Sequence, residues 1–190
     1  MKHKTFICAL LVACLSIAAF STIAYFTTED TATNVITAGN VKIELKETAI
    51  PEGGGEPVPF ENQTGVMPGS EVSKIVQVKN TGKQPAYIRI ILHKSITLAE
   101  DITDESVNLD LIRYDLNTSD WIEKDGYYYY AKPLAAGAET EPLFTRVLFA
   151  NDMGNLYQDC KIEIQVDVEA TQVANNGSTV FEATGWPVDR

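Results

Sequence analysis

Apolar side chains recur at every second position near the C-terminal end of this 190-residue chain, and this pattern constrains the fold more than any other feature. In the stretch CKIEIQVDVE, residues 160–169, apolar residues at even-numbered positions alternate with polar or charged residues at odd-numbered positions. Successive side chains of a β-strand point to opposite faces, so the alternation predicts a strand with one buried and one solvated face.

The same period of two is found in other short stretches. It occurs in residues 41–46 and 87–93, and strand-forming compositions are also found in VSKIVQVKN, residues 72–80, and RVLFA, residues 146–150. Several short strands separated by turns, with little helical periodicity, are typical of antiparallel sheet proteins. The expected fold is therefore all-β, a single antiparallel β-sandwich.

Two turn signals predict hairpins between these strands. The Asn-Thr-Gly sequence at 80–82 leads from the strand 72–80 into a strand that begins near Ala86, so these two strands are expected to pair. The Asp-Gly sequence at 125–126 separates a short strand around Trp121 from the aromatic run that follows, and predicts a second hairpin.

Two other segments lack the strand pattern. The stretch 51–70 contains five glycines and four prolines, which predicts a long solvated loop. Only TDESVNLDLI, residues 103–112, looks locally helical, with Thr103 as its N-cap and acidic residues in its first turn.

The N-terminal residues resemble an export signal. The basic start MKHK is followed by a long uncharged run, as in a secretory signal peptide. Small residues at Thr22 and Ala24 occupy the positions that a signal peptidase reads, so we expect cleavage between Ala24 and Tyr25 and removal of residues 1–24. The alternatives are an uncut anchor, because about 20 apolar residues can span a bilayer, and a lipoprotein modified at Cys14.

Cleavage at this site leaves a strongly acidic chain. Without Lys2 and Lys4 it has 13 basic and 26 acidic residues, and a net charge of −13. Such a chain is not expected to bind nucleic acid or anionic lipid, so its contact with membranes would be limited to the signal peptide. Cys160 is the one cysteine left after cleavage, so no disulfide can form within the exported chain.

The sequence predicts no enzyme activity. The exported part holds one histidine, His93, and no His-Glu-x-x-His, Gly-x-Ser-x-Gly or phosphate-loop motif. A triad would need His93 with Ser95 or Cys160, but a surface histidine and a buried cysteine are the more ordinary interpretation. No catalytic, cofactor-binding or metal-binding residue is therefore assigned.

Calcium and zinc are likewise unsupported as cofactors. Acidic residues cluster between 100 and 110, but their spacing is not that of a calcium-binding loop. We interpret the cluster as a solvated acidic face. Its members are Glu100, Asp101, Asp104, Glu105 and Asp110.

Four consecutive tyrosines, Tyr127, Tyr128, Tyr129 and Tyr130, would alternate between the faces of a strand. Two rings would then face the core, and two would face the solvent or a partner. Packing with the hydroxyl groups at the rim is one interpretation, and an aromatic assembly surface is the other.

The segment TATNVITA, residues 31–38, lies just behind the predicted new N-terminus. It is uncharged, contains no proline or glycine, and is rich in residues that favour strands. A free strand at a chain end can pair with the sheet of another molecule, so the segment is a candidate assembly arm. The alternatives are an edge strand of its own domain or a frayed terminus. The candidate residues are Thr31, Thr33, Val35, Ile36 and Thr37.

The stretch AYFTTEDTATNVITAGNVKIEL, residues 24–45, resembles the N-terminal signature of the TasA and camelysin family of Gram-positive bacteria, whose signal peptides are cut by the signal peptidase SipW. The segments 67–90, 125–144 and 164–176 also resemble parts of the family's sequences, so the resemblance covers nearly the whole exported chain. It implies a jelly-roll fold and, for TasA-like members, biofilm matrix fibres in which the mature N-terminus donates a strand to the next subunit. Camelysin-like members are described as casein-cleaving metalloproteases, but this sequence lacks the pair of histidines that such chemistry would need.

We therefore expect three parts: a signal peptide at 1–24, an N-terminal arm at 25–39, and a β-sandwich domain at 40–190. The expected function is that of a secreted, fibre-forming subunit of the extracellular or biofilm matrix, located in the matrix or at the cell surface. Its expected partners are copies of itself or related matrix subunits, and a SipW-type signal peptidase during export. A surface metalloprotease and a monomeric cell-surface or spore-coat protein are the alternatives.

Overall fold

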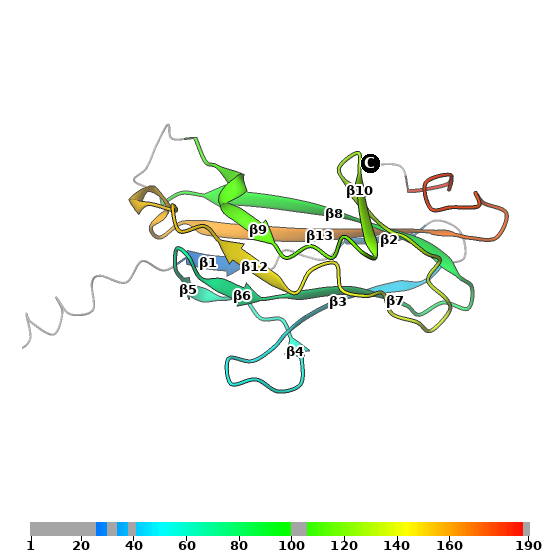
Figure 1. Cartoon of the computed structure of the whole chain (residues 1–190), viewed down its shortest axis with the longest axis horizontal. Coiled ribbons are helices and arrows are strands. Elements are labelled where there is room, and N and C mark those ends of the chain that lie inside the picture. Colours follow the sequence, from blue (N-terminus) through cyan, green and yellow to red (C-terminus); the bar gives the residue numbers. More distant parts are fainter. Residues whose placement is uncertain (1–25, 30–33, 38–40, 100–105, 188–190) are drawn as a thin grey trace, which may run out of the picture.

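The computed structural model describes residues 26–29, 34–37, 41–99 and 106–187, and this part of the chain is mostly β-strand with very little helix (Figure 1). The fold class is all-β, as predicted. The elements are β1 (Phe26–Glu29), β2 (Asn34–Thr37), β3 (Ile43–Ala49), β4 (Val58–Pro59), β5 (Thr64–Val66), β6 (Glu71–Ser73), β7 (Ile75–Asn80), β8 (Ala86–Thr97), η1 (Leu109–Leu111), β9 (Ile112–Tyr114), β10 (Trp121–Lys124), β11 (Tyr127–Tyr130), β12 (Arg146–Phe149), η2 (Asn155–Tyr157) and β13 (Lys161–Gln172).

The largest sheet has seven strands and is centred on β8 and β13. These two 12-residue strands pair antiparallel over their whole length, from Lys161 beside Thr97 to Gln172 beside Ala86. The strand order is β10-β11-β8-β13-β1-β5, and β2 also pairs with β13. The alternating stretch 160–169 therefore belongs to an internal strand, and its apolar side chains from Ile162 to Val168 are buried.

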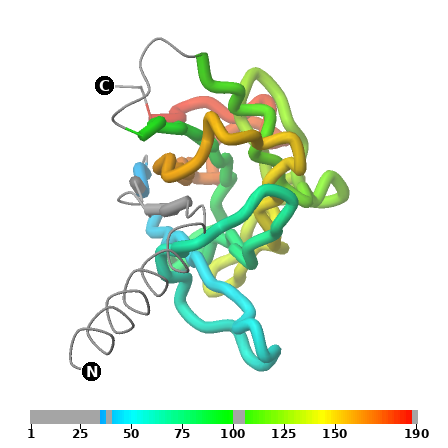
Figure 2. The backbone as a smooth tube through the Cα atoms, turned by 90° about the vertical axis from the view of Figure 1, so that its left-hand side faces the viewer, coloured from blue at the N-terminus to red at the C-terminus, as the bar shows by residue number. Residues whose placement is uncertain are grey.

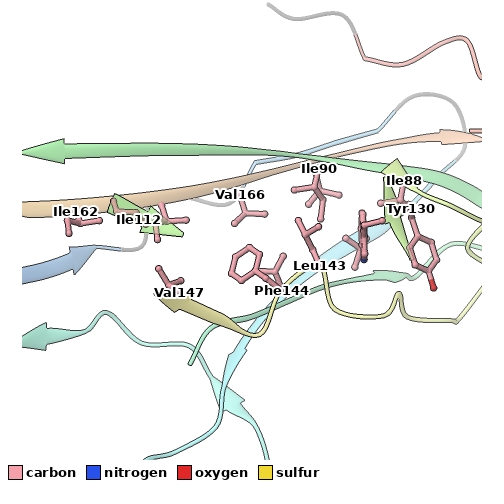
Figure 3. Packing of buried hydrophobic residues seen from close by; sticks show 14 of the residues in the cluster. Ile88, Ile90, Ile112, Tyr130, Leu143, Phe144, Val147, Ile162 and Val166 are labelled. Carbon is pink, nitrogen blue, oxygen red and sulfur yellow. The ribbon is translucent and has the colours of Figure 1, made fainter. Parts of the chain in front are cut away.

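Two three-stranded sheets lie across the core from the large sheet (Figure 1). Their orders are β4-β3-β7 and β6-β12-β9. Figure 3 shows side chains from both layers meeting in one apolar cluster. The labelled members are Ile88, Ile90, Ile162 and Val166 of the large sheet, Ile112 and Val147 of the opposite layer, and Tyr130, Leu143 and Phe144.

The hairpin predicted between residues 72–80 and the strand after Ala86 is wrong. β7 pairs with β3, whereas β8 pairs with β11 and β13 in the other layer, so the chain crosses between layers here. The buried Asn80 side chain explains the difference, because its amide nitrogen donates to the carbonyls of Gln84 (2.8 Å) and Leu134 (3.0 Å). Its oxygen accepts from the Gly82 N–H (2.9 Å), and together these bonds hold an interlayer corner.

The second predicted hairpin is confirmed. β10 and β11 pair antiparallel through a turn in which Asp125 and Gly126 have φ values of 53° and 80°. Positive φ at both positions is the geometry that an Asp-Gly turn supports. The stretch 51–70 is less irregular than expected, because it contains the short strands β4 and β5.

The segment expected to be helical forms only one short turn in its described part. η1 spans Leu109–Leu111, and the Asn108 side chain accepts a hydrogen bond from the Asp110 N–H (3.0 Å) at its start. Thr103, the predicted cap, lies outside the described residues.

A buried ion pair fixes the place where β6 ends and β7 begins. Lys74 stands between the two strands, and its Nζ lies 2.6 Å from Oε1 of Glu47 on β3. The two side chains are only 3% and 7% exposed. The ring of Phe60 covers the ammonium group at 3.9 Å, so the pair also holds the connection between β4 and β5.

Replacing Lys74 with methionine is expected to lower the free energy of unfolding by about 3–5 kcal/mol, because it leaves the Glu47 carboxylate buried without a positively charged partner. A double variant, Lys74→Met with Glu47→Leu, should recover much of that loss, since both charges are then gone. Urea unfolding of the two variants and the parent chain measures this. Equal losses in the single and double variants would mean that the pair is not the source of the effect.

Asp115, which follows β9, joins that strand to β12. Its carboxylate accepts hydrogen bonds from the backbone N–H groups of Thr145 (2.8 Å) and Arg146 (2.6 Å) and from the Thr145 hydroxyl. Burial raises the pKa of Asp115, but these hydrogen bonds and the Arg146 side chain outweigh burial and hold the pKa below its ordinary value. The ionised carboxylate therefore stabilises the fold.

This contribution should be present above the ordinary pKa of an aspartate and be lost as the pH falls through the lowered value. We expect Asp115→Asn to destabilise the protein by about 1 kcal/mol at neutral pH. The difference in the free energy of unfolding between variant and parent should narrow in urea unfolding as the pH falls below the ordinary pKa of an aspartate. A difference that stays constant with pH would contradict the assigned role.

Candidate assembly site at the N-terminal arm

β1 lies between two other strands of the large sheet. On one side it runs parallel to β13, with Thr28 beside Ile162 and Glu29 beside Glu163. On its other side it runs antiparallel to β5, with Phe26 beside Val66. In the order of strands β5 joins the sheet through β1, so these first described residues of the chain are an internal strand (Figure 1).

β2 lies farther along the same edge of β13 as β1. It is parallel to β13, with Asn34 beside Asp167 and Thr37 beside Ala170. β1 and β2 follow β13 in the same direction, and the opposite edge of β13 is taken by β8. The arm therefore borders β13 first at Lys161–Glu163 and then at Asp167–Ala170. Two short segments with parallel pairing thus cover most of one long strand edge, so the prediction of a wholly antiparallel fold is wrong at the arm.

The arm is not free in the single chain. Of the candidate residues, Val35, Ile36 and Thr37 lie on β2 and pair with the chain's own β13, as in the edge-strand alternative. Val35 and Ile36 still expose 39% and 49% of their surface. The physical reason is that β8 occupies one edge of β13, and backbone groups on the other edge need partners as well.

Several predicted positions lie outside the described residues. These are the cleavage site at Ala24 and Tyr25, the arm residues Thr31 and Thr33, and residues 100–105 of the acidic stretch. The predicted arm, residues 25–39, includes β1, but no residue of β1 was among the candidate assembly residues. The overlooked signal was the short run of threonines at 27–28, which carries no charge and favours extended backbone.

The arm can leave this site without unthreading the chain, because it is the N-terminal end of the fold. Only residues 38–42 separate the end of β2 from the start of β3. The β8–β13 ladder contains no arm residue, whereas β5 joins the sheet through β1. The site is therefore a strand-shaped opening that the chain's own arm fills.

The candidate nucleophiles and base do not form a triad. Cys160 is 1% exposed and faces the core, and burial raises the pKa of its thiol to about 11. His93 lies on the outer face, with Nε2 3.3 Å from an Asp167 carboxylate oxygen. Ser95 Oγ donates instead to Glu163 (3.2 Å). Cys160 and His93 thus lie on opposite sides of the sheet.

The four tyrosines divide between the two faces as predicted. Tyr128 and Tyr130 pack with the main core, whereas Tyr127 and Tyr129 lie on the outer face. The outer face is covered by the chain's own C-terminal segment, residues 173–186, so Tyr129 is only 8% exposed. An aromatic surface at this position is therefore largely occupied within the same chain.

Arg89 ties this C-terminal segment to the sheet. Its guanidinium group lies 3.8 Å from the ring centroid of Tyr127 and 4.5 Å from that of Trp186, and it forms an ion pair with Glu169. The Tyr87 hydroxyl also donates to the Gly177 carbonyl (2.9 Å). These contacts give the residues after β13 a defined place on the outer face of the sheet.

In the part of the chain that the structure describes, no group of three or more His, Cys, Asp or Glu side chains is placed to hold a metal ion. Among those same residues, no helix has the length and apolar character needed to cross a membrane. Comparison with known proteins adds no relative: no protein-family model, curated protein or solved structure matches the chain.

Proposed function

We propose that the protein is a secreted structural subunit of an extracellular or biofilm matrix, and that copies join by exchanging the N-terminal arm. In this proposal a SipW-type signal peptidase removes residues 1–24, and the exported chain folds as a β-sandwich of the jelly-roll kind. The resemblance to the TasA and camelysin family supports both steps.

The position of β1 between β13 and β5 carries the proposal. A strand with a neighbour on each side satisfies backbone groups along both edges, so its place is worth more than that of an edge strand. The arm of a second copy has the same sequence and can form the same hydrogen bonds in that place. Exchange of identical elements is a low-cost route from monomers to oligomers, because few contacts are lost.

The geometry of exchange decides the kind of assembly. If two copies trade arms reciprocally, the result is a closed dimer. If each copy donates its arm to the next one, the assembly keeps one open site at one end and one free arm at the other, and it grows head to tail. We propose the second course for the matrix, with backbone pairing supplying the affinity.

Acid or salt should hasten assembly. The exported chain carries a net charge of −13, so copies repel one another at neutral pH and low ionic strength. We expect filaments to appear sooner, by light scattering and electron microscopy, at about pH 4, where carboxylates take up protons, or in about 0.5 M salt, where repulsion is screened. An assembly rate that ignores both conditions would count against a role for charge.

A disulfide placed between the arm and β13 should report which copy holds each arm. Glu29 and Glu163 are register partners on parallel strands, so a Glu29→Cys, Glu163→Cys chain, with Cys160→Ala to remove the native thiol, can form the bond. Oxidised as a monomer, this chain should be locked and fail to form filaments. Filaments grown under reducing conditions and then oxidised should give ladders of linked subunits on a non-reducing gel.

The matched control moves the second cysteine away from the arm. A Glu29→Cys, Glu123→Cys chain places it on β10, at the opposite edge of the sheet, and should assemble without forming ladders. Filaments of the first variant that contain only internal disulfides would show that assembly occurs without exchange. A chain that stays monomeric under every condition would favour the monomeric surface protein.

A further inference from the structure

A groove lies in the layer that faces the seven-stranded sheet, on the side of the core away from the arm. It begins where β3 stops pairing with β7. β3 pairs with β7 as far as Thr48 beside Ile75, and then turns at Pro51 into a hairpin with β4 that projects from the body (Figure 2). β6 comes just before β7 in the sequence, and only Lys74 separates the two strands. Among the described strands β12 is the one that pairs with β6, so the other edge of β6 faces the groove.

Hydrogen bonds on the β12 side show which groups of β6 point into the groove. The Lys74 N–H donates to the Thr145 carbonyl (3.0 Å), and the Phe149 N–H donates to the Ser70 carbonyl (3.0 Å). In an antiparallel pair the bonded positions alternate, so residues 70, 72 and 74 face β12. The backbone N–H and C=O groups of Glu71 and Ser73 therefore face the opposite way. The hairpin stays close to β6 at Ser73, because the Ile50 N–H donates to the Ser73 hydroxyl (2.9 Å).

The groove combines this strand edge with apolar and acidic side chains. It encloses about 440 Å³ between β6 and the β3–β4 hairpin. Ile50 and Val58 are 40% and 45% exposed on the hairpin side. All charged residues lining this hollow are carboxylates: Glu52, Glu61 and Glu71. Arg146, in the adjoining hollow, is engaged by Glu71 and Asp115.

We propose that the groove binds an extended segment of a second, different protein, in which basic residues flank small aliphatic ones. The segment would add as a strand to β6, with backbone groups bonding to Glu71 and Ser73 and an aliphatic side chain lying between Ile50 and Val58. Its Lys or Arg side chains would meet Glu52 and Glu61, because Glu71 is already paired with Arg146. A second copy fits less well, since the exported chain is itself acidic. The site is separate from the arm and does not depend on arm exchange.

A synthetic peptide, acetyl-Lys-Val-Thr-Val-Lys-amide, tests the site on the chain from Tyr25 onwards, which retains every described residue. In two-dimensional amide NMR spectra we expect saturable shifts at Glu71 and Ser73. Charge reversal by Glu52→Lys with Glu61→Lys should weaken binding about tenfold. Ser73→Pro should weaken binding more than Ser73→Ala, because both variants lose the hydroxyl that accepts from the Ile50 N–H, and only proline also removes the N–H that faces the groove.

The matched control reverses two exposed carboxylates on the seven-stranded side of the molecule, Glu123→Lys with Glu182→Lys, and should leave binding unchanged. Equal binding of a peptide with glutamate in place of lysine would overturn the proposal, as would absence of shifts at millimolar peptide. Shifts confined to the β13 edge would assign the peptide to the arm's site instead. Shifts at Glu71 and Ser73 that grow with protein concentration alone would identify a second copy as the occupant, against the proposal.

Discussion

The antiparallel pairing of β8 with β13 is the interaction on which the rest of the structure depends. Its unbroken register directs the apolar residues of β13 into the core and its charged residues to the outer face. A shift by one residue would exchange the two faces, so the buried set fixes the register. All other strands of the large sheet are then placed by their pairing with one of these two, with β10 and β5 one strand further out.

The second edge of β13 links the fold to the proposed assembly. With the arm in place, β13 is internal, and its backbone groups are paired on both sides. Without the arm, a long edge would be open, and open edges are where sheet proteins join other chains. In the proposed filament the same pairing that completes one subunit would be supplied by its neighbour, while the core and the β8–β13 ladder remain unchanged.

The fold class followed from the period of two, because burial of one strand face is a local property of the sequence. Which strands pair with each other was harder to predict from the sequence. The turn at residues 80–82 looks like a hairpin in sequence, yet the buried Asn80 side chain makes it a corner between layers. The arm was recognised from its strand-forming residues, but its place beside β13 depends on contacts more than a hundred residues away in sequence. The groove at β6 arises because β3 stops pairing with β7 and forms a hairpin with β4, and no local sequence motif predicts this change.

The most direct test of the arm's role is cryo-electron microscopy of filaments grown from the secreted protein, at a resolution that traces residues 38–42 between β2 and β3. Arm exchange predicts that this connection crosses the subunit boundary, so that the strands between β13 and β5 of one copy belong to the next. Density that returns each arm to the β3 of the same copy would contradict the account.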